Sequence, residues 1–150
     1  MNFSDEPIPF APPSLLHQAE VEELNSFLLV SIDNWKELDP DATPLRRDAI
    51  HSHIYQLVYE HFELDVRSFT ISEGEFFVML SRARSTTLIR ACNTLKHALN
   101  NLDMGFGVPL EVSMALTQAG DNWVPYKVLL RLRRALNASR EQGSNLLCIT

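Results

Sequence analysis

Four aspartates lie around the end of one apolar segment, where they could hold a cation. Asp33 closes the apolar run 26–33, and Asp39, Asp41 and Asp48 follow it closely in the sequence. Carboxylate oxygens are ligands for hard divalent cations, and open α/β sheets place ligands at the carboxyl ends of their strands. This acidic neighbourhood leaves weak cation binding open, although we predict no resident metal ion.

His51 and His53 resemble a metal-binding pair, but their spacing argues against a shared ion. Residues two apart on a helix point about 200° away from each other, so the two imidazoles cannot reach one metal. We therefore expect a solvated or partly packed helix face. The serines are equally unpromising as nucleophiles, because no G-x-S-x-G elbow is present.

Arginines are concentrated in two stretches, one near the start of the helix expected from Ser85 and one within the last expected helix. They are Arg82, Arg84 and Arg90 in the first stretch and Arg131, Arg133, Arg134 and Arg140 in the second. The second stretch is either an ordinary charged helix face or a patch for an acidic partner or a nucleotide phosphate. If it is a patch, Arg131 and Arg134 are the expected contact residues.

The overall composition excludes several classes of protein. The chain has 150 residues, is 45% hydrophobic and carries a formal charge of −6, which suits one domain with a real core and argues against a nucleic-acid binder. Apolar runs fall short of the roughly 18 residues that a membrane span needs, and no leader is recognisable. Cys92 and Cys148 are too few for a disulfide framework. We expect a cytoplasmic protein without a cofactor.

The sequence divides into a short arm and one domain. Residues 1–13 hold four of the eight prolines, a density that blocks helix formation and predicts a flexible arm. Residues 14–150 form the predicted domain.

Hydrophobic periodicity and turn residues indicate an order of strands and helices within that domain. The expected elements are a helix over 15–24, a strand over 26–33, a helix from Thr43-Pro44 to about His61, a hairpin of strands 66–72 and 73–82, a helix from Ser85, a strand over 110–116, a helix from Asn122 to about Gly143, and a short buried strand over 145–149. This order predicts an α/β (α+β) fold with a mixed sheet of about five strands, flanking helices and a ferredoxin-like core.

The hairpin carries a resemblance to a known family. Ser72, Glu73, Gly74, Glu75 and Phe76 are similar to the G-G-[DE]-E-F signature of GGDEF (diguanylate cyclase) domains, which an apolar strand follows. Three further segments match in the same order: 31–39 resembles D-[IL]-D-x-F-K-x-[IL]-N, 112–115 resembles S-[IV]-G-V, and 135–145 resembles A-L-Y-x-A-K-x-x-G-R-N. The resemblance covers residues 25–150 and implies a nucleotidyl-cyclase-like fold, with Trp35 in the core at the family's phenylalanine position.

The resemblance also implies a chemistry whose residues are missing here. A GGDEF cyclase joins two GTP molecules held on two facing subunits, and carboxylates hold two divalent cations against the triphosphate. Those carboxylate positions fall on Ser31 and Gly74, so only Glu75 remains of the catalytic set. Glu73 would in addition repel a triphosphate. We therefore predict a degenerate domain that is not an enzyme.

Nucleotide-binding positions are only partly kept. The guanine-reading pair corresponds to Asp39 and Asp48, and the phosphate-binding lysine corresponds to Arg140, whereas the later arginine is Ser144. The inhibitory R-x-x-D motif falls on residues 63–66 and is lost at both ends, which disfavours cyclic di-GMP binding there.

These substitutions predict a regulatory or scaffold protein that acts through protein–protein interaction, in bacterial cyclic di-GMP signalling that governs biofilm, motility or secretion. The implied partner is a GGDEF-, EAL- or PilZ-type signalling protein or a second copy of the chain. The alternative is a non-catalytic sensor of GTP or cyclic di-GMP that uses Asp39, Asp48 and Arg140.

Overall fold

The computed structural model describes residues 24–38, 44–62, 66–72, 74–81, 85–102, 105, 108–120, 123–143 and 146–150. Its elements are β1 (Leu24–Ile32), α2 (Trp35–Leu38), α3 (Pro44–His61), β2 (Val66–Ser72), β3 (Glu75–Ser81), α4 (Ser85–Asn100), β4 (Val112–Gln118), α5 (Pro125–Arg140) and β5 (Leu147–Ile149). None of the described helices has the length and hydropathy to cross a membrane.

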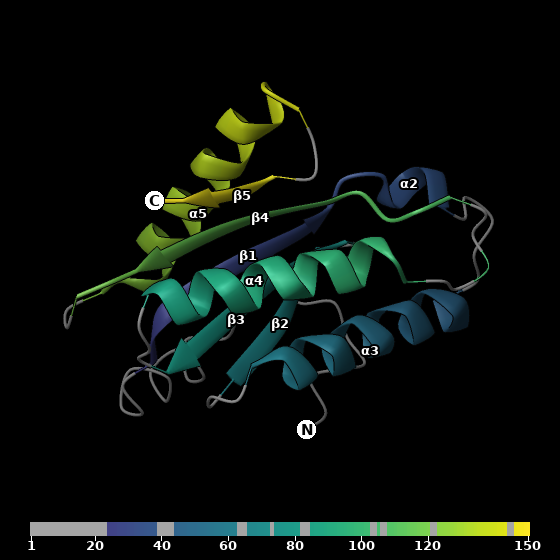
Figure 1. Ribbon diagram of the computed structural model, residues 1–150, viewed down its shortest axis with the longest axis horizontal. Coiled ribbons are helices and arrows are strands. Elements are labelled where there is room, and N and C mark those ends of the chain that lie inside the picture. The colour runs from purple at the N-terminus through teal and green to yellow at the C-terminus, as the bar shows by residue number, and fades with distance from the viewer. Residues whose placement is uncertain are drawn as a thin grey trace.

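The strands form one five-stranded sheet in the order β2-β3-β1-β4-β5. β5 runs parallel to β4, and every other pair is antiparallel. α3 and α4 cover one face of this sheet and α5 covers the other (Figure 1). The mixed α/β sheet predicted from the sequence is therefore confirmed.

β1 lies at the centre of the sheet because its side chains are apolar on both faces. Leu28, Val30 and Ile32 pack in the core beneath α3 and α4. Phe27 and Leu29 pack in the second core beneath α5. The strand predicted over 26–33 is therefore confirmed, and it is the central strand of the sheet.

Several element bounds differ from the expected ones. β4 begins and ends two residues later than predicted, α5 spans Pro125–Arg140 instead of 122–143, and α2 is an additional short helix. α5 begins where Pro125 can take the first helical position, since that position needs no backbone N–H. The arm over 1–13 and the predicted helix over 15–24 lie outside the described residues, except that Leu24 already belongs to β1.

β5 is not the buried strand that its apolar sequence predicts. It is a strand of three residues at the sheet edge, and its Ile149 side chain is 55% exposed. An edge strand has a neighbour on one side only, so part of its apolar surface meets solvent.

The β2–β3 hairpin is tied to α3 by aromatic contacts. Phe76 is fully buried and meets the rings of His51 and Tyr55 edge-on, at 5.4 and 5.5 Å between centroids. The Tyr55 hydroxyl shares a hydrogen bond with Thr70 on β2. Burial raises the pKa of Tyr55, and the hydrogen bond to Thr70 only partly offsets that rise.

These contacts predict that Phe76→Ala costs about 3–5 kcal/mol of the free energy of unfolding, because a large buried ring is lost. Urea denaturation followed by circular dichroism measures this cost. Tyr126→Ala is the matched control, since that ring is 61% exposed and its loss is expected to cost less than about 0.5 kcal/mol. Equal losses in the two variants would contradict the packing described.

Candidate functional site

A pocket of about 640 Å³ opens where β1 ends, lined by Ser31, Ile32, Asp33, Trp35, Lys36, Glu37, Glu75, Arg140 and Gly143. The sheet register assembles it, because Ser31 on β1 lies opposite Glu75 on β3 and Ser113 on β4. α5 ends beside the same strand and contributes Arg140. Residues predicted from the sequence as remnants of a catalytic site are thus brought together here.

Arg140 connects α5 to the end of β1. Its Nε donates to Asp33 Oδ1 at 3.1 Å, and its Nη2 donates to Ser31 Oγ. The other oxygen of Asp33 accepts a hydrogen bond from Ser113 Oγ on β4. With only 11% of its side chain exposed, Asp33 has this guanidinium as a positive partner, which stabilises the carboxylate.

Glu75 is held in a similar way by neighbours of its own. Ser72 Oγ donates to Glu75 Oε1 at 2.6 Å, and Arg133 Nη2 lies 3.7 Å from the same oxygen. The carboxylate of Glu75 is therefore paired with a cation from α5.

Gly74, the third residue of the signature, has no room for a side chain. Its φ is +78°, and a Cβ there would lie 2.9 Å from Trp35 Cγ. Trp35 in turn stacks on His51 with ring centroids 5.0 Å apart, which holds it in place. Trp35 is partly buried against the core as expected, and it excludes a carboxylate from the third position.

Asn34 fixes the turn that follows β1. Its side chain donates to Pro109 O at 2.9 Å and accepts from Glu111 N at 2.9 Å. Asp33 N also donates to Glu111 O at 2.7 Å. The turn that carries Asp33 is thereby clamped to the segment that leads into β4.

The residues of the pocket do not fit divalent cations of the kind that serve GTP chemistry. Ser31 is neutral and already binds Arg140, and Asp33 and Glu75 each face an arginine. Glu37 is the third carboxylate of the lining. Hard cations prefer several free carboxylate oxygens. In the part of the chain that the structure describes, no group of three or more His, Cys, Asp or Glu is placed to hold a metal.

The other predicted site residues are scattered or outside the described chain. Asp48 is exposed on α3 and does not line the pocket. His51 is buried and His53 is exposed, so the two rings diverge as their spacing indicates. Asp39, Asp41, Glu73, Ser144 and the residues of 63–65 lie outside the described chain, so the paired use of Asp39 and Asp48 stays a prediction.

Comparison with known proteins gives a result for structure alone. No protein-family model matches the chain, and no curated protein matches it either. The crystal structure of the Pseudomonas aeruginosa diguanylate cyclase SiaD in complex with its activator SiaC matches with a TM-score of 0.76 at 13% identity, over 91% of this chain and 57% of that one. The active GGEEF domain of a diguanylate cyclase from Vibrio cholerae matches with a TM-score of 0.73 at 14% identity, over 91% and 89%.

The chain has the fold of a GGDEF domain. A third match is the S helix-GGDEF-EAL part of Vibrio cholerae LapD bound to c-di-GMP, with a TM-score of 0.70 at 15% identity, over 91% of this chain and 33% of that one. The chain spans little more than half of the SiaD chain and a third of the LapD chain. The GGDEF-like fold that the signature hairpin predicts is confirmed.

Sequence reasoning did not find Ser113, Asn34 or the pairing of Glu75 with Arg133. Ser113 occupies a β4 position that the motif marks only as part of an apolar strand. Its role depends on the β1–β4 register, which pairs residues 82 positions apart in the sequence, as in Ser31↔Ser113.

The close approach of Trp35 predicts that Gly74→Asp destabilises the domain by more than about 2 kcal/mol, because positive φ and a steric overlap combine. Gly120→Asp is the control, since nothing lies within 4 Å of a Cβ there, and it is expected to change stability by less than about 0.5 kcal/mol. Chemical denaturation of both variants provides the measurement. A Gly74→Asp variant as stable as the parent chain would refute this account of the turn.

Proposed function

We propose that this GGDEF-fold domain carries out no cyclase chemistry and acts as a regulatory or scaffold module through protein–protein contact, within bacterial cyclic di-GMP signalling. The observation that carries the proposal is the contact of Arg140 with Ser31 and Asp33. A cationic side chain of the protein itself fills the end of β1, where the resemblance implies a metal-bound carboxylate.

The charge arrangement supports this proposal. A cyclase must neutralise a triphosphate with metal ions while carboxylates hold those ions in place. Here two carboxylates at the pocket, Asp33 and Glu75, are paired with Arg140 and Arg133, so an ion that used them would have to break both pairs. A domain that keeps this fold without that chemistry acts through the contacts of its surface with other proteins.

The protein partners of the structural matches agree with such a role. The match to SiaD is a complex with an activator protein, and the LapD structure joins a GGDEF domain to an EAL domain. By analogy with these folds, the partner is another signalling protein of this type or a second copy of the chain.

Incubation of the purified protein with GTP and Mn²⁺, followed by chromatography, tests the loss of activity. We expect no cyclic di-GMP, while an active GGEEF domain assayed in parallel yields product. The variant Ser31→Asp/Gly74→Asp, which restores both carboxylates, is expected to stay inactive, because Trp35 leaves no space for a side chain at position 74. Product that disappears in Glu75→Gln would overturn the proposal.

A nucleotide sensor is the second candidate, since Arg140 and Lys36 both line a pocket of about 640 Å³. Their positive charges suit a phosphate. Against this, Asp48 lies away from the pocket and Arg140 is already engaged. Isothermal titration with GTP and with cyclic di-GMP, each with and without Mg²⁺, is expected to give no micromolar binding. Such binding, abolished by Asp48→Ala, would favour the sensor.

A further inference from the structure

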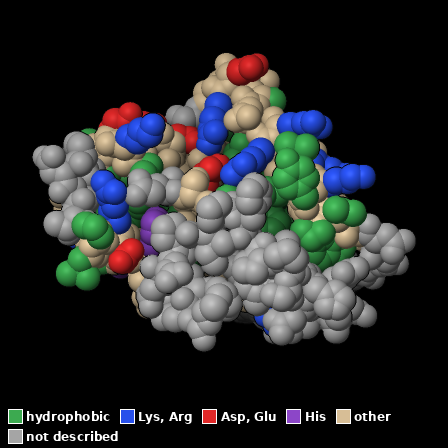
Figure 2. Space-filling view, turned by 180° about the vertical axis from the view of Figure 1, so that it is seen from behind, with side chains coloured by type: hydrophobic (Ala, Val, Ile, Leu, Met, Phe, Trp, Pro, Cys, Tyr) green, Lys and Arg blue, Asp and Glu red, His purple; other side chains and the backbone are tan. Residues whose placement is uncertain are grey.

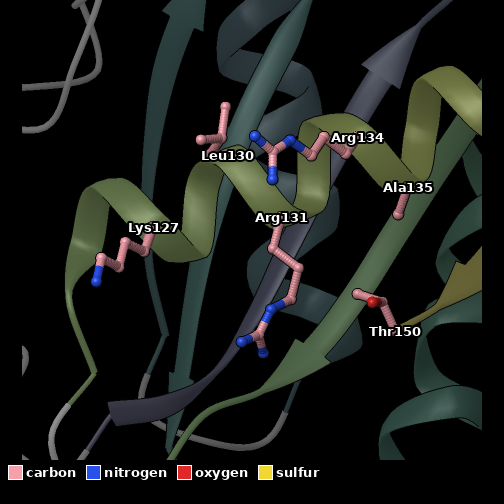
Figure 3. Close-up of a pocket in the computed structure, with 6 residues that line it drawn as sticks. All are labelled: Lys127, Leu130, Arg131, Arg134, Ala135 and Thr150. Atoms are coloured by element: carbon pink, nitrogen blue, oxygen red, sulfur yellow. The ribbon is translucent and has the colours of Figure 1, made fainter.

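A second pocket lies on the outer flank of α5. Its volume is about 600 Å³, and Lys127, Leu130, Arg131, Arg134, Ala135 and Thr150 line it (Figure 3). The three basic residues are spaced i, i+4 and i+7, so they share one face of the helix. The opposite face carries the buried residues Val128, Leu129, Leu132 and Leu136.

This basic flank faces the end of the sheet, because Thr150 directly after β5 belongs to the same pocket. Figure 1 shows β5 as the outermost strand, lying alongside α5. The groove is therefore bounded by α5 and by Thr150, the residue that follows β5.

The outer edge of β5 has backbone groups available for pairing. Leu146 O accepts from Met114 N, and Thr150 N donates to Leu116 O, so alternate residues starting at 146 face β4. Backbone groups alternate in direction along a strand, so those of Leu147 and Ile149 face away from β4. Within the described chain, no strand pairs with β5 on that side.

Charge and apolar surface lie together at this groove. Lys127, Arg131 and Arg134 concentrate positive charge on a chain with a net charge of −6. Leu130 and Ala135 add apolar surface to the lining of the groove, and the ring of Tyr126, 61% exposed, lies on the same helix. In Figure 2, Lys and Arg side chains gather on the upper part of the rear face, next to a hydrophobic patch.

We propose that this groove binds an acidic, extended segment of a partner protein, which adds as a further strand beside β5. The backbone of the segment pairs with Leu147 and Ile149, and its carboxylates pair with Lys127, Arg131 and Arg134. A free sheet edge beside a helix is a recurring site of strand addition. The proposal rests on the proposed function, since it supplies the surface through which an interaction module would act.

Charge and backbone pairing favour this occupant over a nucleic acid. A basic groove attracts acidic side chains and raises their rate of encounter. The chain as a whole is acidic, which disfavours a phosphate backbone at long range, and β5 offers backbone pairing that a nucleic acid cannot use.

A labelled peptide that alternates glutamate and valine tests the proposal by fluorescence anisotropy with the full chain. We expect binding that weakens with salt and hydrogen-exchange protection of the Leu147 and Ile149 amides. Arg131→Glu/Arg134→Glu should weaken binding by about tenfold or more. Arg90→Glu is the control, since Arg90 is exposed on α4 across the sheet.

Two further peptides separate strand addition from simple charge attraction. A lysine–valine peptide should not bind, and the acidic peptide with alternate backbone nitrogens methylated should bind at least about tenfold more weakly, since it cannot complete the ladder. Equal binding of the methylated peptide, or binding without protection of β5, would overturn the proposal.

Other occupants would give different results. Preferential binding of a single-stranded oligonucleotide, or self-association of the chain abolished by Arg131→Glu/Arg134→Glu, would also overturn the proposal. Circular dichroism checks the fold of each variant, and Arg131→Gln/Arg134→Gln replaces any charge reversal that fails to fold. If the peptide does not bind, the results expected from GTP turnover and nucleotide titration do not change. Strand addition at β5 and the proposed function can therefore fail independently of each other.

Discussion

The burial of β1 on both faces determines where the other elements lie. Its apolar side chains require α3 and α4 on one face and α5 on the other, with β3 and β4 as its neighbours. The same arrangement brings together the C-terminal ends of β1 and α5 and the first residue of β3, at one end of the strands. Ser31, Glu75 and Arg140 meet there because open α/β sheets place their binding positions at the ends of the strands, beyond the packed core.

At these strand ends, two carboxylates of the protein are paired with two of its arginines. Arg140 binds Asp33 and Ser31. Ser113 donates a hydrogen bond to the other oxygen of Asp33, and Arg133 faces Glu75. Ionic pairs of this kind are costly to break when partly buried, because each partner would be left with an unpaired charge. In the proposed function, the fold of a cyclase domain persists without its chemistry, and α5 supplies the positive charge at the end of β1.

The sequence predicted the hairpin and the order of strands and helices along the chain, because apolar runs and turn residues are local signals. It also predicted that Ser31 and Gly74 lack carboxylates, since a motif aligns residue by residue. It could not reveal that Trp35 blocks Gly74, that Asn34 clamps the segment before β4, or that Arg133 faces Glu75, because these contacts depend on tertiary packing. The exposure of β5 was missed because an apolar run does not indicate whether a strand has one neighbour or two.

A Mn²⁺ titration followed by electron paramagnetic resonance, comparing the parent chain with Asp33→Asn, tests whether the Arg140 guanidinium takes the place of a metal ion. If it does, we expect no Asp33-dependent binding of Mn²⁺ at concentrations up to about 1 mM. Stoichiometric Mn²⁺ binding that Asp33→Asn abolishes would contradict it, because Asp33 would then be a metal ligand rather than the partner of Arg140.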